Sequence, residues 1–237
     1  MLDEGKPSSA SEPDFAAAVR MAREGFLEPQ LARELPGLRL VWATVAARPQ
    51  RSPPELAVRL RALASRYRGA SVVALRAQPI PHAYRSFFRG VGLDPDTDRI
   101  PLEQAAVLRL LEGEFRSRGL IEDALLLALI ETGVPVWALD AARVSPGGLG
   151  IRLSRRGERL GEGRLARPLG VGRLLVADRQ RPHALLFGQI APGHEVSRRT
   201  DTVVLFSVGV AGVPAIHIEE AVWQALELLA EHGTEGD

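Results

Sequence analysis

Apolar and polar positions follow two different periods along the chain, the helical period of 3.6 in its first half and the strand period of two in its second. A short helix is expected over 15–24, after the polar segment 11–14, and a buried strand over 38–47, after Pro36-Gly37. The same reasoning predicts further helices over 53–66, 81–91 and 102–113, the last two separated by the turn-rich LDPDTDRIP. Segment 121–132 is apolar almost all round, which predicts a helix buried in the core.

From residue 134 onward, short runs rich in β-formers are separated by glycine and proline. These runs are VPVWALD, LGIRLSR, RLLVAD, HALLFGQI and DTVVLFSVGV. A closing helix over 216–232 carries Ile218, Val222, Leu226 and Leu229 on one face and Glu219, Glu220, Glu227 and Glu231 around the other. This order of elements predicts an α/β or α+β fold in which helices flank a mixed β-sheet.

The length of 237 residues and a hydrophobic content of 46% suit one sizeable core. Residues 1–13 are expected to form a disordered tail, and 14–237 a single domain. The N-terminal segment has acids at Asp3 and Glu4 and no apolar run, so neither a signal peptide nor a membrane anchor is expected. The longest apolar stretch, ALLLALI, is far shorter than the roughly 20 residues of a membrane-spanning helix. We therefore expect a cytoplasmic protein that does not contact membranes.

The residue types exclude several kinds of chemistry. Cysteine is absent, so disulfides, thiolate catalysis and a cysteine-ligated metal are excluded. GEGRLA over 161–166 formally matches a dinucleotide-binding pattern, but Pro168 interrupts the helix that would hold the pyrophosphate. Ser207 lacks the first glycine of a nucleophile elbow and is expected in a strand. The histidines have no metal-binding spacing, so neither a cofactor nor a metal is expected.

Charge is strongly segregated although the net charge is only +1. Residues 143–199 hold 12 arginines against four acids, and residues 200–237 hold seven acids and no lysine or arginine. Of the 30 basic residues only Lys6 is a lysine, and the arginine guanidinium matches the geometry of phosphate. Genomic base composition or a hot habitat would also enrich arginine, so two explanations stay open.

A series of linked elements across 84–209 resembles the B3/4 domain, the tRNA-binding and editing domain of the phenylalanyl-tRNA synthetase beta chain. In TGVPVWALD, the residues similar to the family's glycine-x-proline and terminal aspartate are Gly133, Pro135 and Asp140. The residues that resemble its next strand, turn and hydroxyl loop are Gly148, Arg152, Gly157, Glu158, Asp178, Ser197, Arg199 and Thr200. The chain departs from the family in the buried helix, where leucines follow Glu122 and Asp123, and at Gly172-Arg173, where relatives often show Gly-Glu.

The resemblance implies an α/β domain that contacts tRNA or its charged 3′ end. As catalytic residues it favours Glu158 and Asp140, with a rival explanation for each. Glu158 could hold an ammonium group or orient water, or it could simply offset neighbouring arginines. Asp140 could face a pocket, or it could accept hydrogen bonds in a turn.

Further residues are candidates for holding the substrate: Asp123, Gly133, Gly148, Glu162, His194 and Thr200. Asp123 could equally be an acid that favours the start of a helix, and His194 and Thr200 could lie in a solvated loop. The expected RNA-binding residues are Arg152, Arg155, Arg156, Arg159, Arg164, Arg198 and Arg199.

The predicted function is binding of tRNA or aminoacyl-tRNA, with hydrolysis of a mischarged ester as a further activity of the same domain. An aminoacyl ester is already activated, so its hydrolysis needs an oriented water more than a strong nucleophile. The alternative is a noncatalytic RNA- or ligand-binding module that kept the fold and lost the site. A third possibility is a small-molecule enzyme that uses the same pocket. The sequence leaves the oligomeric state open.

Overall fold

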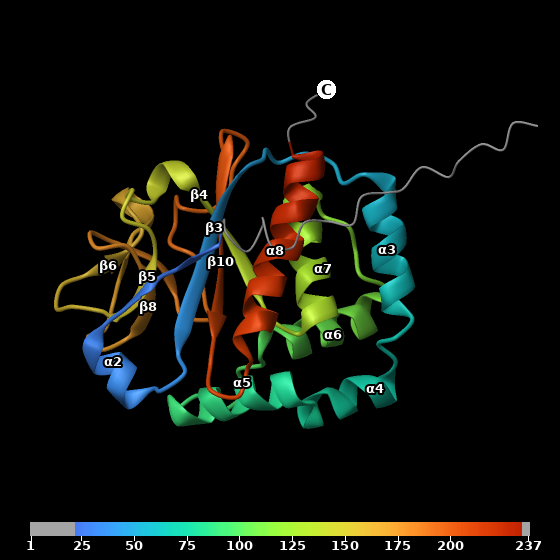
Figure 1. Cartoon of the computed structure of the whole chain (residues 1–237), viewed down its shortest axis with the longest axis horizontal. Helices are drawn as coiled ribbons and strands as arrows, with labels where there is room; N and C mark the ends of the chain where they lie inside the picture. Colours follow the sequence, from blue (N-terminus) through green and yellow to red (C-terminus); the bar gives the residue numbers. More distant parts are fainter. Residues whose placement is uncertain (1–21, 234–237) are drawn as a thin grey trace, which may run out of the picture.

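The computed structural model describes residues 22–233, which form two four-stranded β-sheets, a small two-stranded sheet and the helices that cover them (Figure 1). The strands are β1 (Arg23–Glu24), β2 (Phe26–Leu27), β3 (Arg39–Ala46), β4 (Val136–Asp140), β5 (Gly150–Leu153), β6 (Arg159–Leu160), β7 (Arg167–Pro168), β8 (Leu174–Ala177), β9 (Pro182–Leu185) and β10 (Thr202–Gly209). The α-helices are α2 (Pro29–Glu34), α3 (Pro54–Ala64), α4 (Gly69–Ala74), α5 (Pro79–Gly90), α6 (Pro101–Glu112), α7 (Leu120–Thr132) and α8 (Ala215–His232). Helices and strands thus combine in one α+β fold.

The central sheet has the strand order β1-β3-β10-β4, and all its pairs are antiparallel. Every residue of β10 except Thr202 is buried, as expected for a nearly continuous apolar strand covered on both faces. On one face α8 packs against β3 and β10, and α7 packs against α8 (Figure 1). The apolar side of α8 predicted from the sequence is the buried one, with Ile218, Val222 and Leu229 at 0% exposure.

The second sheet, in the order β2-β5-β8-β9, lies on the other side of the central sheet (Figure 1). Its β2–β5 pair is parallel and its other pairs are antiparallel, so the expected mixed sheet is this one. A small hairpin of β6 and β7 extends from it. The strands could not be assigned to two sheets from the sequence, because single strands of both sheets have the same apolar, β-forming residue pattern.

We use the name loop edge for the end of the central sheet at which β3 and β4 end and β10 begins. It is a row of strand ends, not an edge strand. Helix α7 starts at this edge, and α8 ends there, since the Arg48 amide donates to the Gly233 carbonyl at 3.2 Å. Loops from four parts of the chain therefore meet along one side of the molecule, at the top of Figure 1. This convergence positions the candidate site.

Two expected elements differ from the structure. Most of the helix expected over 15–24 lies outside the described residues, but its end is wrong, because Arg23 and Glu24 form β1 and pair with β3. The strand expected through HALLFGQI ends at Leu185. There the chain turns, with Phe187 in the left-handed region at φ 56°, and the Phe187 ring packs against the rings of Tyr84 and Trp137. Burial of this ring offsets the strained backbone.

No helix among residues 22–233 is both long enough and apolar enough to cross a membrane.

Candidate functional site

Asp140 ends β4 at the loop edge, and its carboxylate is held by groups of the chain itself. One oxygen accepts the Ala142 amide at 3.0 Å, which is the turn geometry considered for this residue, and the other accepts the Thr200 hydroxyl at 3.0 Å. The Asp140 amide donates to the His194 carbonyl at 3.1 Å. Asp140 therefore lies together with His194 and Thr200, two candidates from a loop more than 50 residues later in the sequence.

A hollow of about 500 Å³ opens beside Asp140. Its lining contains the guanidinium groups of Arg143, Arg198 and Arg199, together with Ser197 and the carboxylate of Glu195. Glu162, another predicted residue, lies next to this hollow, since its carboxylate pairs with Arg143 at 3.8 Å and also with Arg181. The hollow is therefore polar, with three arginines and two carboxylates in its lining.

Thr200 and His194 are buried at about 1% exposure, so neither side chain is open to solvent. The Thr200 hydroxyl accepts the Ser197 amide at 3.0 Å and donates to Asp140, which fixes the start of β10. The imidazole of His194 points inward to His183 instead of into the hollow, with a distance of 2.9 Å between the two Nδ1 atoms. Both residues support the loop that carries Arg198 and Arg199.

Asp123 lies in the first turn of α7 and is 1% exposed. Its carboxylate accepts hydrogen bonds from the hydroxyls of Ser52 and Ser117, both at 2.5 Å, and from the Arg118 amide at 2.9 Å. Its place in the first turn of α7 fits the helix-start explanation, and its carboxylate also joins two loops at the loop edge. A buried carboxylate with three donors holds these loops firmly.

Glu158 lies in the turn after β5, on the second sheet, and forms a two-point ion pair with Arg152 at 2.5 and 2.9 Å. Arg152 is only 4% exposed, so it does not belong to the surface on which RNA was expected to bind. Burial alone would raise the pKa of Glu158, but the hydrogen bonds from Arg152 and the Arg155 amide outweigh burial and hold the pKa below its usual value. Asp140 and Glu158 have separate partners on different sheets, and the structure does not bring them together.

The two candidate glycines, Gly133 and Gly148, allow backbone conformations with a positive φ. Gly133 ends α7 with a φ of 77°, at the end of the helix remote from the loop edge. Gly148 is buried with a φ of 76°, and a Cβ atom there would collide with the indole of Trp42. The side of Gly148 on which a Cβ atom would lie is therefore occupied by Trp42.

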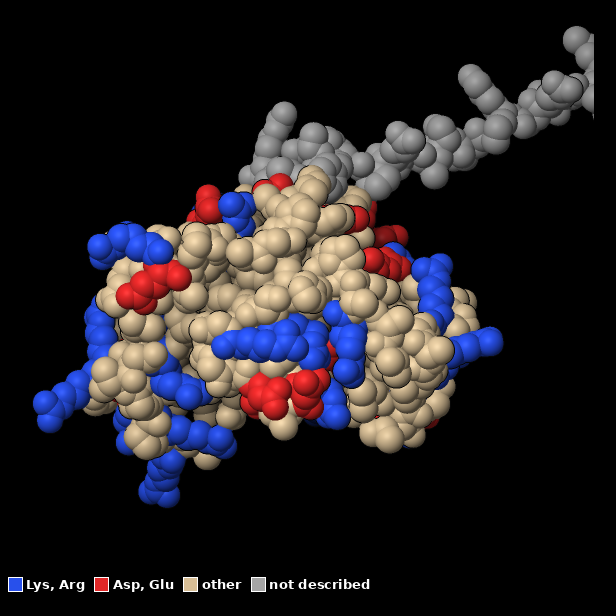
Figure 2. Space-filling model, turned by 90° about the horizontal axis from the view of Figure 1, so that it is seen from below, with Lys and Arg blue, Asp and Glu red and all other residues tan. Residues whose placement is uncertain are grey.

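Exposed arginines gather on the turns and the hairpin of the second sheet. We define the arginine surface as Arg155, Arg156, Arg159, Arg164, Arg167 and Arg173, all exposed. The turn 154–158 lies beside the turn 169–173, since the Ser154 amide donates to the Arg173 carbonyl at 2.8 Å and the Leu169 amide to the Glu158 carbonyl at 2.9 Å. Figure 2 shows this gathering of basic side chains on the left of the face seen from below, while basic and acidic side chains alternate in the middle.

Four members of the arginine surface have free guanidinium groups. Among the described residues, these groups form no ion pair or hydrogen bond in Arg155, Arg156, Arg164 and Arg173. Arg159 donates to the Ala166 carbonyl, and Arg167 donates to Gln189 at 2.9 Å. Most of the positive charge on this surface is thus available to a partner.

Sequence reasoning missed two exposed arginines at the loop edge. Arg51 and Arg118 are exposed there, each in a short Arg–Ser segment next to a helix start, and that repeated pairing was the available signal.

Asp178, one of the residues that carry the family resemblance, follows β8 of the second sheet and is fully buried. It accepts the Ser145 hydroxyl at 2.6 Å and the amides of Gln180 and Arg181, both at 2.7 Å. Burial raises the pKa of Asp178, but these donors outweigh burial and place the pKa well below its usual value.

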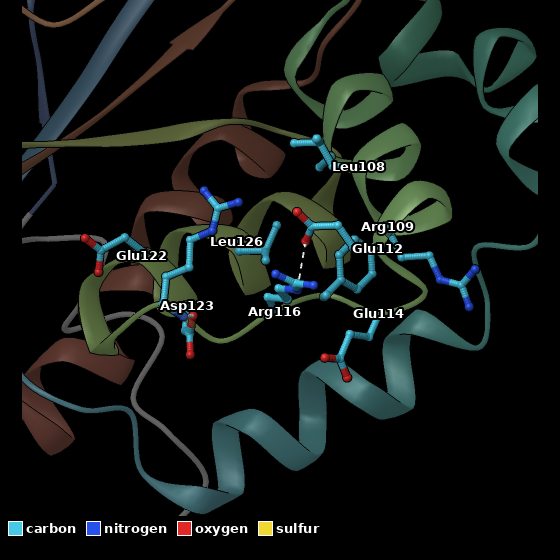
Figure 3. A pocket seen from close by; sticks show the side chains of 11 residues that line it. Leu108, Arg109, Glu112, Glu114, Arg116, Glu122, Asp123 and Leu126 are labelled. Carbon is cyan, nitrogen blue, oxygen red and sulfur yellow. Dashed lines mark hydrogen bonds and ion pairs between the residues drawn. The ribbon is translucent and has the colours of Figure 1, made fainter.

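A smaller hollow of about 180 Å³ lies between α6 and α7. Figure 3 shows Leu108 and Leu126 in its wall and Glu112 facing Arg116, while Glu122 and Asp123 lie at one end. Glu112 and Arg116 form an ion pair at 3.6 Å. Because these charges neutralise each other and the rest of the wall is largely apolar, this hollow does not share the cationic character of the loop edge.

Comparison with known proteins adds one relative. No protein-family model matches the chain. The phenylalanine–tRNA ligase beta subunit of Gloeobacter violaceus is 31% identical to it over 166 residues, which covers 60% of this chain and 20% of that subunit. The chain thus spans about a fifth of the length of this relative. The similarity indicates that the chain contains a domain related to part of a phenylalanine–tRNA ligase beta subunit.

Proposed function

We propose that this protein binds RNA, with tRNA as its partner, through the arginine surface of the second sheet. The observation that carries the proposal is the set of exposed, unpaired guanidinium groups on two adjacent turns. Arginine is well suited to phosphate because its planar group can donate two parallel hydrogen bonds. The similarity to a tRNA ligase subunit supports tRNA over other RNA.

The distribution of acidic residues supports this orientation. Helix α8 carries Glu219, Glu220, Glu227 and Glu231 and covers the face of the central sheet that is turned away from the second sheet. Like charges repel, so phosphates would avoid α8 and approach the arginine surface. The basic turns of the second sheet and the acidic residues of α8 thus lie on opposite sides of the central sheet.

We propose binding without ester hydrolysis. Asp140 and Glu158 are each held by donors of the chain itself, and they do not face a common space. A general base needs to reach the attacking water, and the ion pair with Arg152 holds Glu158 away from the hollow that Asp140 lines, so Glu158 does not assist Asp140 there. We therefore expect the purified protein to leave a panel of correctly and wrongly charged tRNAs intact.

The experiment that tests binding is a measurement of tRNA affinity across a range of salt concentrations. Each neutralised phosphate contributes a slope of roughly 0.9 to the dependence of log affinity on log salt. With about four contacts, the affinity should fall about 100-fold between 50 and 200 mM salt. An affinity that barely changes over this range would contradict binding through the arginine surface. Hydrolysis of any charged tRNA would contradict binding without hydrolysis and would assign a deacylase activity instead.

A further inference from the structure

Three arginines from three separate loops surround a second cavity at the loop edge, which we call the arginine hollow. Arg51 follows β3, Arg118 precedes α7 and Arg198 precedes β10. The cavity has a volume of about 600 Å³, and Gln50, Ser52, Ser117 and Gly119 complete its polar wall. Arg198 also lines the hollow beside Asp140, so the two cavities adjoin.

The positive charges of the arginine hollow are not balanced within the described part of the chain. The guanidinium groups of Arg51, Arg118 and Arg198 form no ion pair there, and no described carboxylate lines the cavity. Two acids lie beside the cavity without pairing with these arginines. Asp123 is buried and already accepts three hydrogen bonds, and the exposed Glu122 carboxylate lies on the side of Gly119, with its Oε2 atom 3.0 Å from where a Cβ atom of that residue would be. Guanidinium groups gathered around one cavity repel each other unless an anion lies between them. An anionic ligand is the partner that this arrangement lacks.

The walls of the arginine hollow are fixed before any ligand binds. Asp123 joins Ser52 to Ser117, and the Leu120 amide donates to the Gln50 carbonyl at 3.0 Å. The Gln50 amide group in turn donates to the His232 carbonyl at the end of α8. Gly119, with a φ of 144°, lets the loop before α7 pass close to the Gln50 carbonyl. A site built in advance loses less entropy when a ligand binds.

We propose that the arginine hollow binds the phosphate group of a phosphomonoester attached to a ligand of nucleotide size. Three guanidinium groups match the two negative charges and several acceptor oxygens of a phosphomonoester. A cavity of about 600 Å³ is much larger than a phosphate ion and lies in the usual range for small-molecule sites. The terminal phosphate of an RNA strand and a free nucleotide are the two sources of this group. The site is separate from the arginine surface and does not depend on the proposed function.

The test begins with AMP and adenosine, titrated into the full chain and followed by isothermal titration calorimetry. AMP should bind saturably and adenosine should not. Arg118→Gln and Arg51→Gln should each weaken AMP binding about tenfold or more, because each removes hydrogen bonds from a charged donor to the phosphate. Arg61→Gln is the matched control, since Arg61 is exposed on α3 away from the cavity. Its affinity for AMP should equal that of the wild type.

A second pair of ligands distinguishes the two sources. If the source is an RNA end, a 5′-phosphorylated oligonucleotide should bind about tenfold more tightly than its 5′-hydroxyl counterpart, and Arg118→Gln should remove the difference. If AMP binds but the two oligonucleotides bind equally, the source is a free nucleotide. Arg155→Gln with Arg156→Gln should weaken RNA binding yet leave AMP binding unchanged, which separates this site from the proposed function. Failure of both AMP and the 5′-phosphate to show any preference, in proteins with unchanged thermal unfolding, would overturn the site.

Discussion

His183 and His194 face each other inside the second sheet, with their Nδ1 atoms 2.9 Å apart and both side chains buried. Two such nitrogens share one proton, so one ring donates and the other accepts. The Nε2 atom of His183 lies 3.1 Å from Asp178, which favours a proton on that nitrogen. His183 then accepts at Nδ1, and His194 donates. The two rings and the Asp178 carboxylate thus form a row, and burial favours the neutral form of both imidazoles.

The first prediction is that acid weakens the fold through these rings. Burial lowers the pKa of both His183 and His194 below the value of 6.5 for an unfolded chain, although Asp178 partly opposes this lowering at His183. Between 6.5 and the folded pKa values the unfolded chain binds more protons. The free energy of unfolding should therefore fall as the pH drops below about 6.5, by at most about 1.4 kcal/mol per pH unit for each ring that stays neutral in the folded protein. Denaturant titrations between pH 8 and pH 5 measure this loss.

His194→Asn is the informative variant, because asparagine keeps an N–H group near Nδ1 of His183 and removes one titrating ring. It should reduce the loss of stability between pH 8 and pH 5. His82→Asn is the control, since His82 is exposed on α5. If the wild type and both variants lose stability equally, the pH dependence arises elsewhere.

The second prediction concerns Glu158, whose role as an ion-pair partner can be distinguished from a catalytic one. Glu158→Ala leaves the guanidinium group of Arg152 buried without its partner, which should cost about 3 kcal/mol in the free energy of unfolding. Adding Arg152→Met should recover most of this loss, because the uncompensated charge is then removed. If Glu158 were only catalytic, Glu158→Ala would lose little free energy of unfolding, with or without Arg152→Met. Urea titrations measure this free energy.

The third prediction uses two neighbouring glycines. Gly148→Ala should destabilise the fold by roughly 2–4 kcal/mol, because alanine resists a φ of 76° and its Cβ atom would collide with Trp42. Gly147→Ala is the matched control, since nothing lies within 4 Å of a Cβ atom at that position. Urea midpoints of the two variants provide the comparison. Equal midpoints would show that Trp42 moves aside easily and that Gly148 borders an adaptable space.

The sequence predicts the long elements well and the short ones poorly. Helices α3, α5, α6, α7 and α8 and strand β3 lie within about two residues of their expected bounds, because each buries a long stripe or run that the periodicity reveals. In contrast, Arg23 and Glu24 form a strand only because β3 lies beside them, with the Arg23 guanidinium 5.3 Å from the centre of the Trp42 ring. Such a short strand depends on tertiary contacts that local sequence does not record.

The candidate site could be predicted only where its residues are close in sequence. Asp140 ends a strand, so its hydrogen bond to the Ala142 amide in the turn that follows could be anticipated. The pairing of Arg152 with Glu158 depends on how the turn after β5 folds back, and the meeting of Arg51, Arg118 and Arg198 depends on the order of strands in the central sheet. Strand order is set by the packing of the whole chain, and single segments do not reveal it.

The fourth prediction is that two arginines on the turn after β5 contribute strongly and without sequence preference to RNA binding. Arg155→Gln with Arg156→Gln removes two exposed guanidinium groups that form no ion pair or hydrogen bond among the described residues, so the fold should keep its thermal stability. If both contact phosphates, the salt slope should fall by about 1.8, and the affinity for different tRNAs should fall by a similar factor.

Arg66→Gln with Arg68→Gln is the matched control for this pair. These two arginines are also exposed and lie close together in sequence, but they follow α3, far along the chain from the second sheet. The control should retain the wild-type affinity and the wild-type salt slope in filter-binding or fluorescence titrations. If the control weakens binding as much as the Arg155 and Arg156 pair does, the response reflects net charge alone. RNA would then be attracted to the whole molecule, because only contacts localised on the arginine surface can make the two pairs differ.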